Sequence, residues 1–415
     1  MDNFYFNYKD LFKAPRMAIG PQRIALATLG IMVAHFVYLF FTYLSIMIGG
    51  FSVSAIWSQF GLFPCAYYGW HLPFYSYILY WFGLILTGYI LLLMSTAVSR
   101  AAYMHLRENL FYTYRQALKF TKSKALSVAG TYITFLVLIL PFIIGAIIMA
   151  LIGRIPWFGE LLNAFATLPY IFAGMVLVFF TLSLFVSFFF GPIIISTSEE
   201  DGFGAAVQSL HLTWGQPWRL ILYGITVVAL EIFGILFFAF TLKVGLIIYS
   251  ILFMPLMHSL APMLDNALRM IQLSLGAIHD AIVSLLGPTG SKLFYLKENY
   301  AALQLNLPLS TVVSSYVVYF FLLLAAYMTI GYGEAVANTA LVISYVIFDR
   351  KLTDTNLLTR KDSEIEEEDD DSEPGENDTK DLAEAGSSED NESSGGEPND
   401  SDGNDGDDPQ AEKSE

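Results

Sequence analysis

The sequence predicts an all-α membrane protein, a bundle of transmembrane helices, and three observations lead to this fold class. First, 55% of the 415 residues are hydrophobic although the formal net charge is −16. Second, residues 362–415 hold 24 acidic residues and only 2 lysines, so that residues 1–361 are weakly basic. Third, residues 1–361 contain uncharged apolar runs of about 20 residues or more, the length that crosses a bilayer. A soluble enzyme, a fibrous protein and a disulfide-rich secreted domain are therefore excluded.

Six apolar segments have the length of membrane-spanning helices. At a rise of about 1.5 Å per residue, about 20 residues cross a hydrocarbon core of about 30 Å. The longer segments must tilt or kink, and Pro141 is a candidate kink. The predicted spans, which make up a transmembrane domain over residues 24–348, cover residues 24–49, 76–97, 125–152, 161–190, 220–241 and 311–331.

Lysine and arginine are concentrated in alternate connections between these spans. On one side, residues 1–23 carry four, residues 98–124 carry six, residues 191–219 carry one and residues 349–361 carry four. On the other side, residues 50–75 carry none, residues 153–160 carry one and the long stretch 242–310 carries four. Short loops rich in Lys and Arg stay in the cytoplasm. We therefore expect both termini to be cytoplasmic.

The two ends of the chain differ in character from the bundle. Residues 1–23 mix aromatic and polar side chains, which is typical of a segment at the level of the lipid headgroups. Residues 349–415 are predicted to be a disordered acidic cytoplasmic tail, because the stretch from Glu364 onward is highly charged and has no aromatic side chain. The tail could recruit a basic protein, hold divalent cations loosely or act as a solvated spacer.

Two further apolar regions affect the number of spans. Residues 244–264 lack a charge but contain prolines, and we expect residues 244–310 to form a hairpin on the outer face, re-entrant or lying on the surface up to residue 286. Residues 335–348 are too short to cross alone, and we expect them to continue the sixth span through a break at Gly331 and Gly333. An eight-span arrangement that counts both regions keeps the tail on the same side.

The two basic-side connections between spans indicate an internal repeat. Five identical residues recur at a constant offset of 92 residues: Glu108, Phe111, Gln116, Leu118 and Thr121 match Glu200, Phe203, Gln208, Leu210 and Thr213. The predicted copies are residues 76–152 and 161–241, each a span, an amphipathic helix and a span, which is a parallel repeat. Asn109 and Asp201 are predicted to cap the two amphipathic helices.

These amphipathic helices are predicted to lie on the membrane surface, with the lipid bilayer as partner. The first carries a basic set suited to anionic headgroups, Arg107, Arg115, Lys119, Lys122 and Lys124. The second lacks that set and has Trp214 and Trp218, which suit the membrane–water interface.

Three stretches resemble a known family: Ala14–Ala18 (APRMA), Ile155–Glu160 (IPWFGE), and the segment from Glu200–Phe203 (EDGF) to Pro217–Arg219 (PWR). On these residues the chain resembles uncharacterised multi-span membrane proteins from bacterial genomes of the planctomycete type, over most of residues 1–360. The resemblance implies this topology in a bacterial inner membrane. It implies no chemistry, because that family has no assigned activity.

Residues 196–226 are also loosely similar to the membrane domain fused to some glycerophosphodiester phosphodiesterases. The similarity concerns that membrane anchor alone, and the sequence contains no phosphodiesterase catalytic segment. Gly204 departs from the family's pattern, in which an acidic residue often follows the phenylalanine.

No catalytic motif is present. The sequence lacks HExxH, Gly-x-Ser-x-Gly and a Rossmann glycine pattern, and Gly287–Lys292 has the wrong spacing for a phosphate-binding loop. The six histidines show no metal-ligand spacing, and Cys65 is the only cysteine, which excludes an intrachain disulfide. We expect no enzyme, cofactor, metal site or nucleic-acid partner.

Two polar residues inside predicted spans form a candidate intramembrane site, because charge in hydrocarbon is costly. His35 and Glu231 each lie 11 residues after the predicted start of their span, hence about 16 Å deep. Equal depth allows a buried contact and a proton-coupled or gating site. The alternatives are a protonated Glu231 bonded to a nearby hydroxyl such as that of Tyr223 or Thr226, or a His35 that faces headgroup water.

The function that best fits these features is a non-enzymatic membrane scaffold that recruits other membrane proteins, or basic cytoplasmic proteins through its tail. The alternative is a transporter or lipid-handling protein that uses the Glu231 and His35 site. The alternative requires a cavity at Glu231.

Overall fold

The computed structural model describes residues 4–67, 71–109, 111–276, 284, 287, 307–353 and 356–359. The chain divides into two units, Met1–Thr359 and Arg360–Glu415, and the described residues all belong to the first. Their regular structure is helical, without a strand, which confirms the predicted all-α class. The predicted acidic tail beyond residue 359, and most of the predicted outer hairpin after residue 276, lie outside the described residues.

Among the described residues, six helices are long and apolar enough to cross a membrane, as the sequence predicts for a multi-pass membrane protein. They are α2 (Pro21–Ile48), α4 (Phe74–Leu106), α6 (Ala125–Ile152), α8 (Thr167–Ser198), α10 (Pro217–Phe253) and α13 (Leu309–Thr353). The shorter elements are η1 (Tyr8–Lys13), α1 (Ala14–Ala18), α3 (Val53–Phe60), α5 (Tyr114–Ser123), α7 (Phe158–Phe165), α9 (Gly202–Gly215), α11 (Leu260–Leu275) and η2 (Leu357–Thr359). Several long helices extend well beyond the predicted spans.

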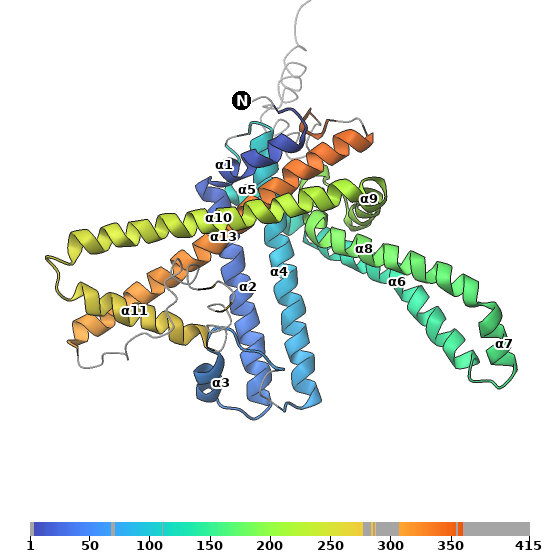
Figure 1. The fold of residues 1–415 in the computed structure, drawn as a ribbon, viewed down its shortest axis with the longest axis horizontal. Helices are drawn as coiled ribbons and strands as arrows, with labels where there is room; N and C mark the ends of the chain where they lie inside the picture. The colour runs from blue at the N-terminus through green and yellow to red at the C-terminus, as the bar shows by residue number, and fades with distance from the viewer. Residues whose placement is uncertain are drawn as a thin grey trace, which may run out of the picture. The chain divides into compact units, whose positions relative to one another are not determined.

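The long helices of the first unit are arranged in pairs (Figure 1). Helix α2 lies beside α4, α6 lies beside α8 with α7 at their far turn, and α10 crosses α13. Helix α11 packs against the first part of α13, and the second part of α13 contacts α4, α8 and α1. Helix α13 is therefore the element that joins the pairs.

The hydrophobic core surrounds the second half of α13. Almost every residue from Gly331 to Asp349 is buried, and Val342, Ile343, Ile347 and Phe348 have no exposed surface. The ends of α4 and α8 that precede the short helices α5 and α9 are buried against it. A helix that is apolar on every side is typical of such an enclosed position.

Helix α13 runs without interruption through Gly331 and Gly333, so the predicted break at these glycines is wrong. The two glycines instead allow close packing on two sides. A Cβ atom at Gly331 would lie 2.4 Å from Thr28 Oγ1 of α2, and one at Gly333 would lie 2.4 Å from Ile235 Cγ1 of α10. Small residues permit such approaches between membrane helices.

Residues 244–264 do not form a separate helix. Residues 244–253 are the last turns of α10, a turn follows, and α11 then packs on α13. Residues 335–348 belong to α13. Neither region counted in the eight-span arrangement is therefore a separate span, and the described residues hold six candidate spans.

Both predicted repeat copies have the expected order of a long, a short and a long helix. Helices α4 and α8 end, and α6 and α10 begin, at the predicted offset of 92 residues. Asp201 caps α9 by accepting a hydrogen bond from Gly204 N, as predicted. Asn109 does not cap α5, because α5 begins later and Thr113 forms a capping box with Gln116. A common origin of the two copies stays a prediction.

Candidate functional site

A cavity of about 1300 Å³ lies among α4, α6, α8, α10 and α13. Its wall is overwhelmingly apolar and includes aromatic and aliphatic side chains from four helices, among them Phe82, Leu86, Phe185, Phe189, Ile225 and Leu341. The few polar side chains that line it include Ser95, Glu231, Glu334 and Asn338. The cavity therefore combines a large apolar volume with a small polar region.

Two glutamates from neighbouring helices line this cavity. Glu231 belongs to α10 and Glu334 to α13, and both are partly buried. The close approach at Gly333 brings them near each other, since a Cβ atom at Gly333 would lie 3.6 Å from Glu231 Cγ. The helix contact that needs a glycine thus also places the two acids on one wall.

Glu334 is held in place by hydrogen bonds that lead across to α4. Asn338, one turn further along α13, donates from Nδ2 to Glu334 Oε1 at 2.8 Å and to the Glu334 carbonyl at 2.9 Å. Ser95 and Ser99 of α4 donate in turn to Asn338 Oδ1. This polar chain fixes the orientation of Glu334 in otherwise apolar surroundings.

No positive side chain compensates these two acids among the described residues. The ion pairs described within residues 4–359 involve Asp10 and Glu199, and neither Glu231 nor Glu334 takes part in one. A buried charge without a partner is costly, and two like charges side by side repel each other strongly where the effective dielectric constant is low. Neutralisation therefore has to come from a proton or from a cation that enters the cavity.

His35 lies apart from this cavity, with both ring nitrogens engaged. Nε2 is 2.8 Å from the Leu62 carbonyl and Nδ1 is 2.5 Å from the hydroxyl of Tyr327. Because a carbonyl only accepts, the neutral ring carries its hydrogen on Nε2, and Tyr327 donates to Nδ1. The imidazole also stacks on Phe63, with ring centroids 5.0 Å apart.

The described contacts do not bring His35 and Glu231 together. Both lie 14 residues after the first residue of their helix, and their equal depth in the membrane stays a prediction. Helix α13 packs against both α2 and α10 and contacts the two residues at different positions. The hydroxyl of Tyr327 is hydrogen-bonded to His35, whereas Gly333 lies close to Glu231. The alternative partner Thr226 bonds to Tyr8 and to the Leu222 carbonyl instead.

Glu334 and Asn338 were not predicted from the sequence. Glu334 falls three residues beyond the predicted end of the sixth span and follows two glycines, so its local sequence is typical of a loop. One feature of the sequence could have identified it. Residues 309–348 are almost continuously apolar, and Glu334 is the single charged residue among them.

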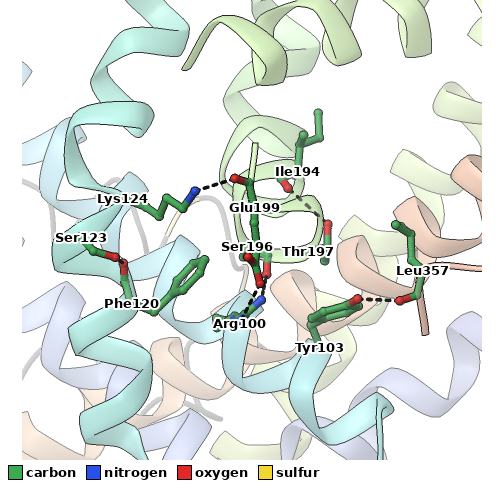
Figure 2. A network of polar contacts seen from close by, with 10 residues as sticks. All are labelled: Arg100, Tyr103, Phe120, Ser123, Lys124, Ile194, Ser196, Thr197, Glu199 and Leu357. Atoms are coloured by element: carbon green, nitrogen blue, oxygen red, sulfur yellow. Dashed lines mark hydrogen bonds and ion pairs between the residues drawn. The ribbon is translucent and has the colours of Figure 1, made fainter. Parts of the chain in front are cut away.

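A second polar site joins α4, α5, α6 and α8, centred on Arg100 (Figure 2). Arg100 has no exposed surface. It donates from Nη1 to the Ser196 carbonyl at 3.0 Å and from Nη2 to Glu199 Oε1 at 3.0 Å. Its guanidinium stacks over Phe120 at 4.1 Å from the ring centroid. Lys124 Nζ donates to the Glu199 carbonyl at 2.5 Å, and Tyr103 donates to the Leu357 carbonyl at 2.7 Å.

This Arg100 site was also not predicted. The orientation rule used Arg100 only as one of six cations in residues 98–124. The available signal was that Arg100 is the only Lys, Arg, Asp or Glu in the whole of α4. A lone charge in an apolar helix requires a partner, and the planar guanidinium group suits a buried one.

Some of the predicted interfacial residues have exposed side chains, and others contact residues within the protein. Arg115, Lys119 and Lys122 are exposed along α5, opposite the buried Ala117, Phe120 and Thr121. Trp214 and Trp218 expose 77% and 73% of their surface. Lys124 instead belongs to the Arg100 site, and the Arg107 guanidinium lies 5.6 Å from the centroid of Tyr103.

Comparison of the chain with protein-family models, curated proteins and solved structures found no match. The resemblance to planctomycete-type membrane proteins and to phosphodiesterase membrane anchors therefore stays a prediction.

Proposed function

We propose that this chain is a non-enzymatic membrane protein that binds and handles a lipid-like amphiphile in the cavity among α4, α6, α8, α10 and α13. The observation that carries the proposal is the cavity itself, about 1300 Å³ and almost wholly apolar, with a small polar region at Glu231 and Glu334. Ordinary small-molecule sites occupy about 300–1,000 Å³. The larger volume suits a molecule with long apolar chains and a small polar head.

The surroundings of the cavity support a ligand taken from the bilayer. In the most apolar 18-residue segments of α4, α6 and α8, only 6%, 6% and 11% of the residues are buried within the protein. Most of the side chains in these segments are therefore available to lipid. The same three helices supply much of the cavity wall. An acyl chain could therefore pass between the bilayer and the cavity without leaving apolar surroundings.

This proposal takes up the lipid-handling alternative in place of the scaffold that the sequence favoured. The alternative required a cavity at Glu231, and the cavity there supports it. His35 has no part in the proposal, because its ring nitrogens are engaged by Leu62 and Tyr327.

A cavity-filling substitution tests the proposal. Gly224 lines the cavity, and a Cβ atom added at this position would have no atom within 4 Å, so the side chain of Gly224→Trp has room to enter the cavity. Gly174 of α8 is exposed, has equally open surroundings and does not line the cavity, which makes Gly174→Trp the matched control. Lipid that stays bound would be counted by native mass spectrometry after release from nanodiscs.

We expect the wild type and Gly174→Trp to retain a bound amphiphile and Gly224→Trp to lose it. Equal retention by Gly224→Trp and Gly174→Trp would contradict binding in the cavity.

A membrane scaffold in the inner membrane, with both termini cytoplasmic, is a second candidate. It is favoured by the exposed basic side chains of α5 and by exposed Trp214 and Trp218, which suit attachment to a bilayer surface. Recruitment is tested by comparing the proteins that co-purify with the full chain and with a chain that ends at Arg360. If the tail recruits partners, basic cytoplasmic proteins should be lost when it is removed. Protease added to sealed right-side-out vesicles should leave the tail intact, and cleavage would refute the orientation.

A further inference from the structure

We propose that the cavity selects an amphiphile with a primary amine headgroup, which binds between Glu231 and Glu334. This inference rests on the proposed function and adds to it the chemical class of the ligand. It starts from the two carboxyl groups that α10 and α13 place on one wall of the cavity.

The charge of the two acids favours a ligand with a cationic group. The described residues supply no cation to either acid, and the cavity wall around them is apolar. The ammonium group of such a headgroup would be attracted by both acids and would relieve their mutual repulsion. A headgroup without a cationic group, such as that of phosphatidylglycerol, would bring only a further negative charge and is disfavoured.

Hydrogen bonding favours a primary amine among cationic groups. A primary ammonium group has three N–H donors, enough for both carboxyl groups and one further acceptor such as the Ser95 hydroxyl, which also lines the cavity. A quaternary ammonium group has no donor and is recognised by aromatic faces instead. Charge-assisted hydrogen bonds to carboxylates therefore favour the primary amine over its methylated analogues.

The Glu334 carboxyl group is preorganised. Asn338 donates one hydrogen bond to Glu334 Oε1 and one to the Glu334 backbone carbonyl, and Ser95 and Ser99 hold Asn338. One carboxyl group is thus already oriented before a ligand arrives, which lowers the entropy cost of binding. Glu231, which forms no described hydrogen bond, can turn towards the amine from the neighbouring helix α10.

The experiment uses the full chain in nanodiscs that contain equal amounts of phosphatidylethanolamine, phosphatidylcholine and phosphatidylglycerol with identical acyl chains. Retained lipid is identified by native mass spectrometry. We expect the wild type to enrich phosphatidylethanolamine by about tenfold over phosphatidylcholine, the preference that one or two charge-assisted hydrogen bonds provide. Glu231→Gln and Glu334→Gln should reduce this ratio towards one, whereas Glu160→Gln in α7, away from the cavity, should not change it.

A second measurement needs no variant. Phosphatidylethanolamine, its N-monomethyl and N,N-dimethyl derivatives and phosphatidylcholine are offered to the wild type, and we expect retention to fall as N–H donors are removed. Lipid that is retained without a headgroup preference, or a preference that both Gln variants keep, would overturn amine selection and leave cavity binding intact. Loss of all retained lipid from the wild type, or unchanged retention in Gly224→Trp, would instead overturn the proposed function.

Discussion

Arg100 and Glu199 form an ion pair of 3.0 Å in which the arginine side chain is fully buried and the glutamate side chain is 20% exposed. Glu199 ends α8 in the left-handed conformation, with φ of 58°, a region that favours glycine. Two hydrogen bonds stabilise the glutamate in this conformation: its side chain accepts one from Arg100, and its carbonyl accepts one from Lys124. One strained residue thus connects α8 to α4 and to the start of α6.

The unequal burial of this pair predicts unequal effects of removing either partner. Glu199→Ala leaves a buried guanidinium without its counter-charge and should lower the free energy of unfolding by about 3–5 kcal/mol. Arg100→Met leaves a carboxylate that reaches solvent and keeps most of the packing on Phe120, so its cost should be smaller. Unfolding in detergent micelles measures both, and the double variant gives the coupling. A larger loss for Arg100→Met would contradict this explanation.

The glycines of α13 predict a packing effect. In Gly331→Ala the new Cβ atom would lie 2.4 Å from Thr28 Oγ1 and 2.9 Å from Thr28 N, and the backbone nitrogen cannot move aside cheaply. We expect a loss of about 1–3 kcal/mol in the free energy of unfolding, typical of overpacking. Gly174→Ala, with no atom within 4 Å, should be neutral or slightly stabilising. Similar values for the two variants would mean that α2 and α13 do not approach each other this closely.

The contacts of His35 predict which residue it is coupled to. A double-mutant cycle of His35→Ala with Tyr327→Phe should give a coupling of about 0.6 kcal/mol, and at most about 1.7 kcal/mol, which are the average and the maximum found for hydrogen bonds between membrane helices. The same cycle with Glu231→Gln should give none, because α13 provides separate contacts to the two residues. Coupling to Glu231 in place of Tyr327 would restore the pairing that equal depth suggested.

The start of α5 predicts that replacing Thr113 destabilises the protein more than replacing Asn109. Thr113 accepts a hydrogen bond from Gln116 N and its own N–H is bonded to the Gln116 side chain, so Thr113→Ala should cost about 1 kcal/mol. Asn109→Ala should cost little, since Asn109 lies before the helix and makes no capping contact. Thermal unfolding of both variants in one detergent provides the comparison.

The candidate site was predictable from the sequence only in part. Glu231 could be identified because a charged residue inside an apolar span is costly wherever the helix lies. Glu334 and Asn338 could not, because their position in the cavity depends on α13 continuing past two glycines into the core. The two acids become one site only through the contact of Gly333 with Ile235 and Glu231.

The helical class, the six long apolar helices and the separation of a weakly basic body from an acidic end follow from the amino-acid sequence alone. Each of these is a property of a local segment, its length, polarity or charge, and needs no knowledge of its neighbours. The packing of the helices was needed to show that α13 joins the helix pairs, that Tyr327 is the partner of His35, and that Arg100 pairs with Glu199. Such contacts join residues about 100 to 300 positions apart, and they depend on side-chain shape at close approach, which no local pattern of hydrophobicity records.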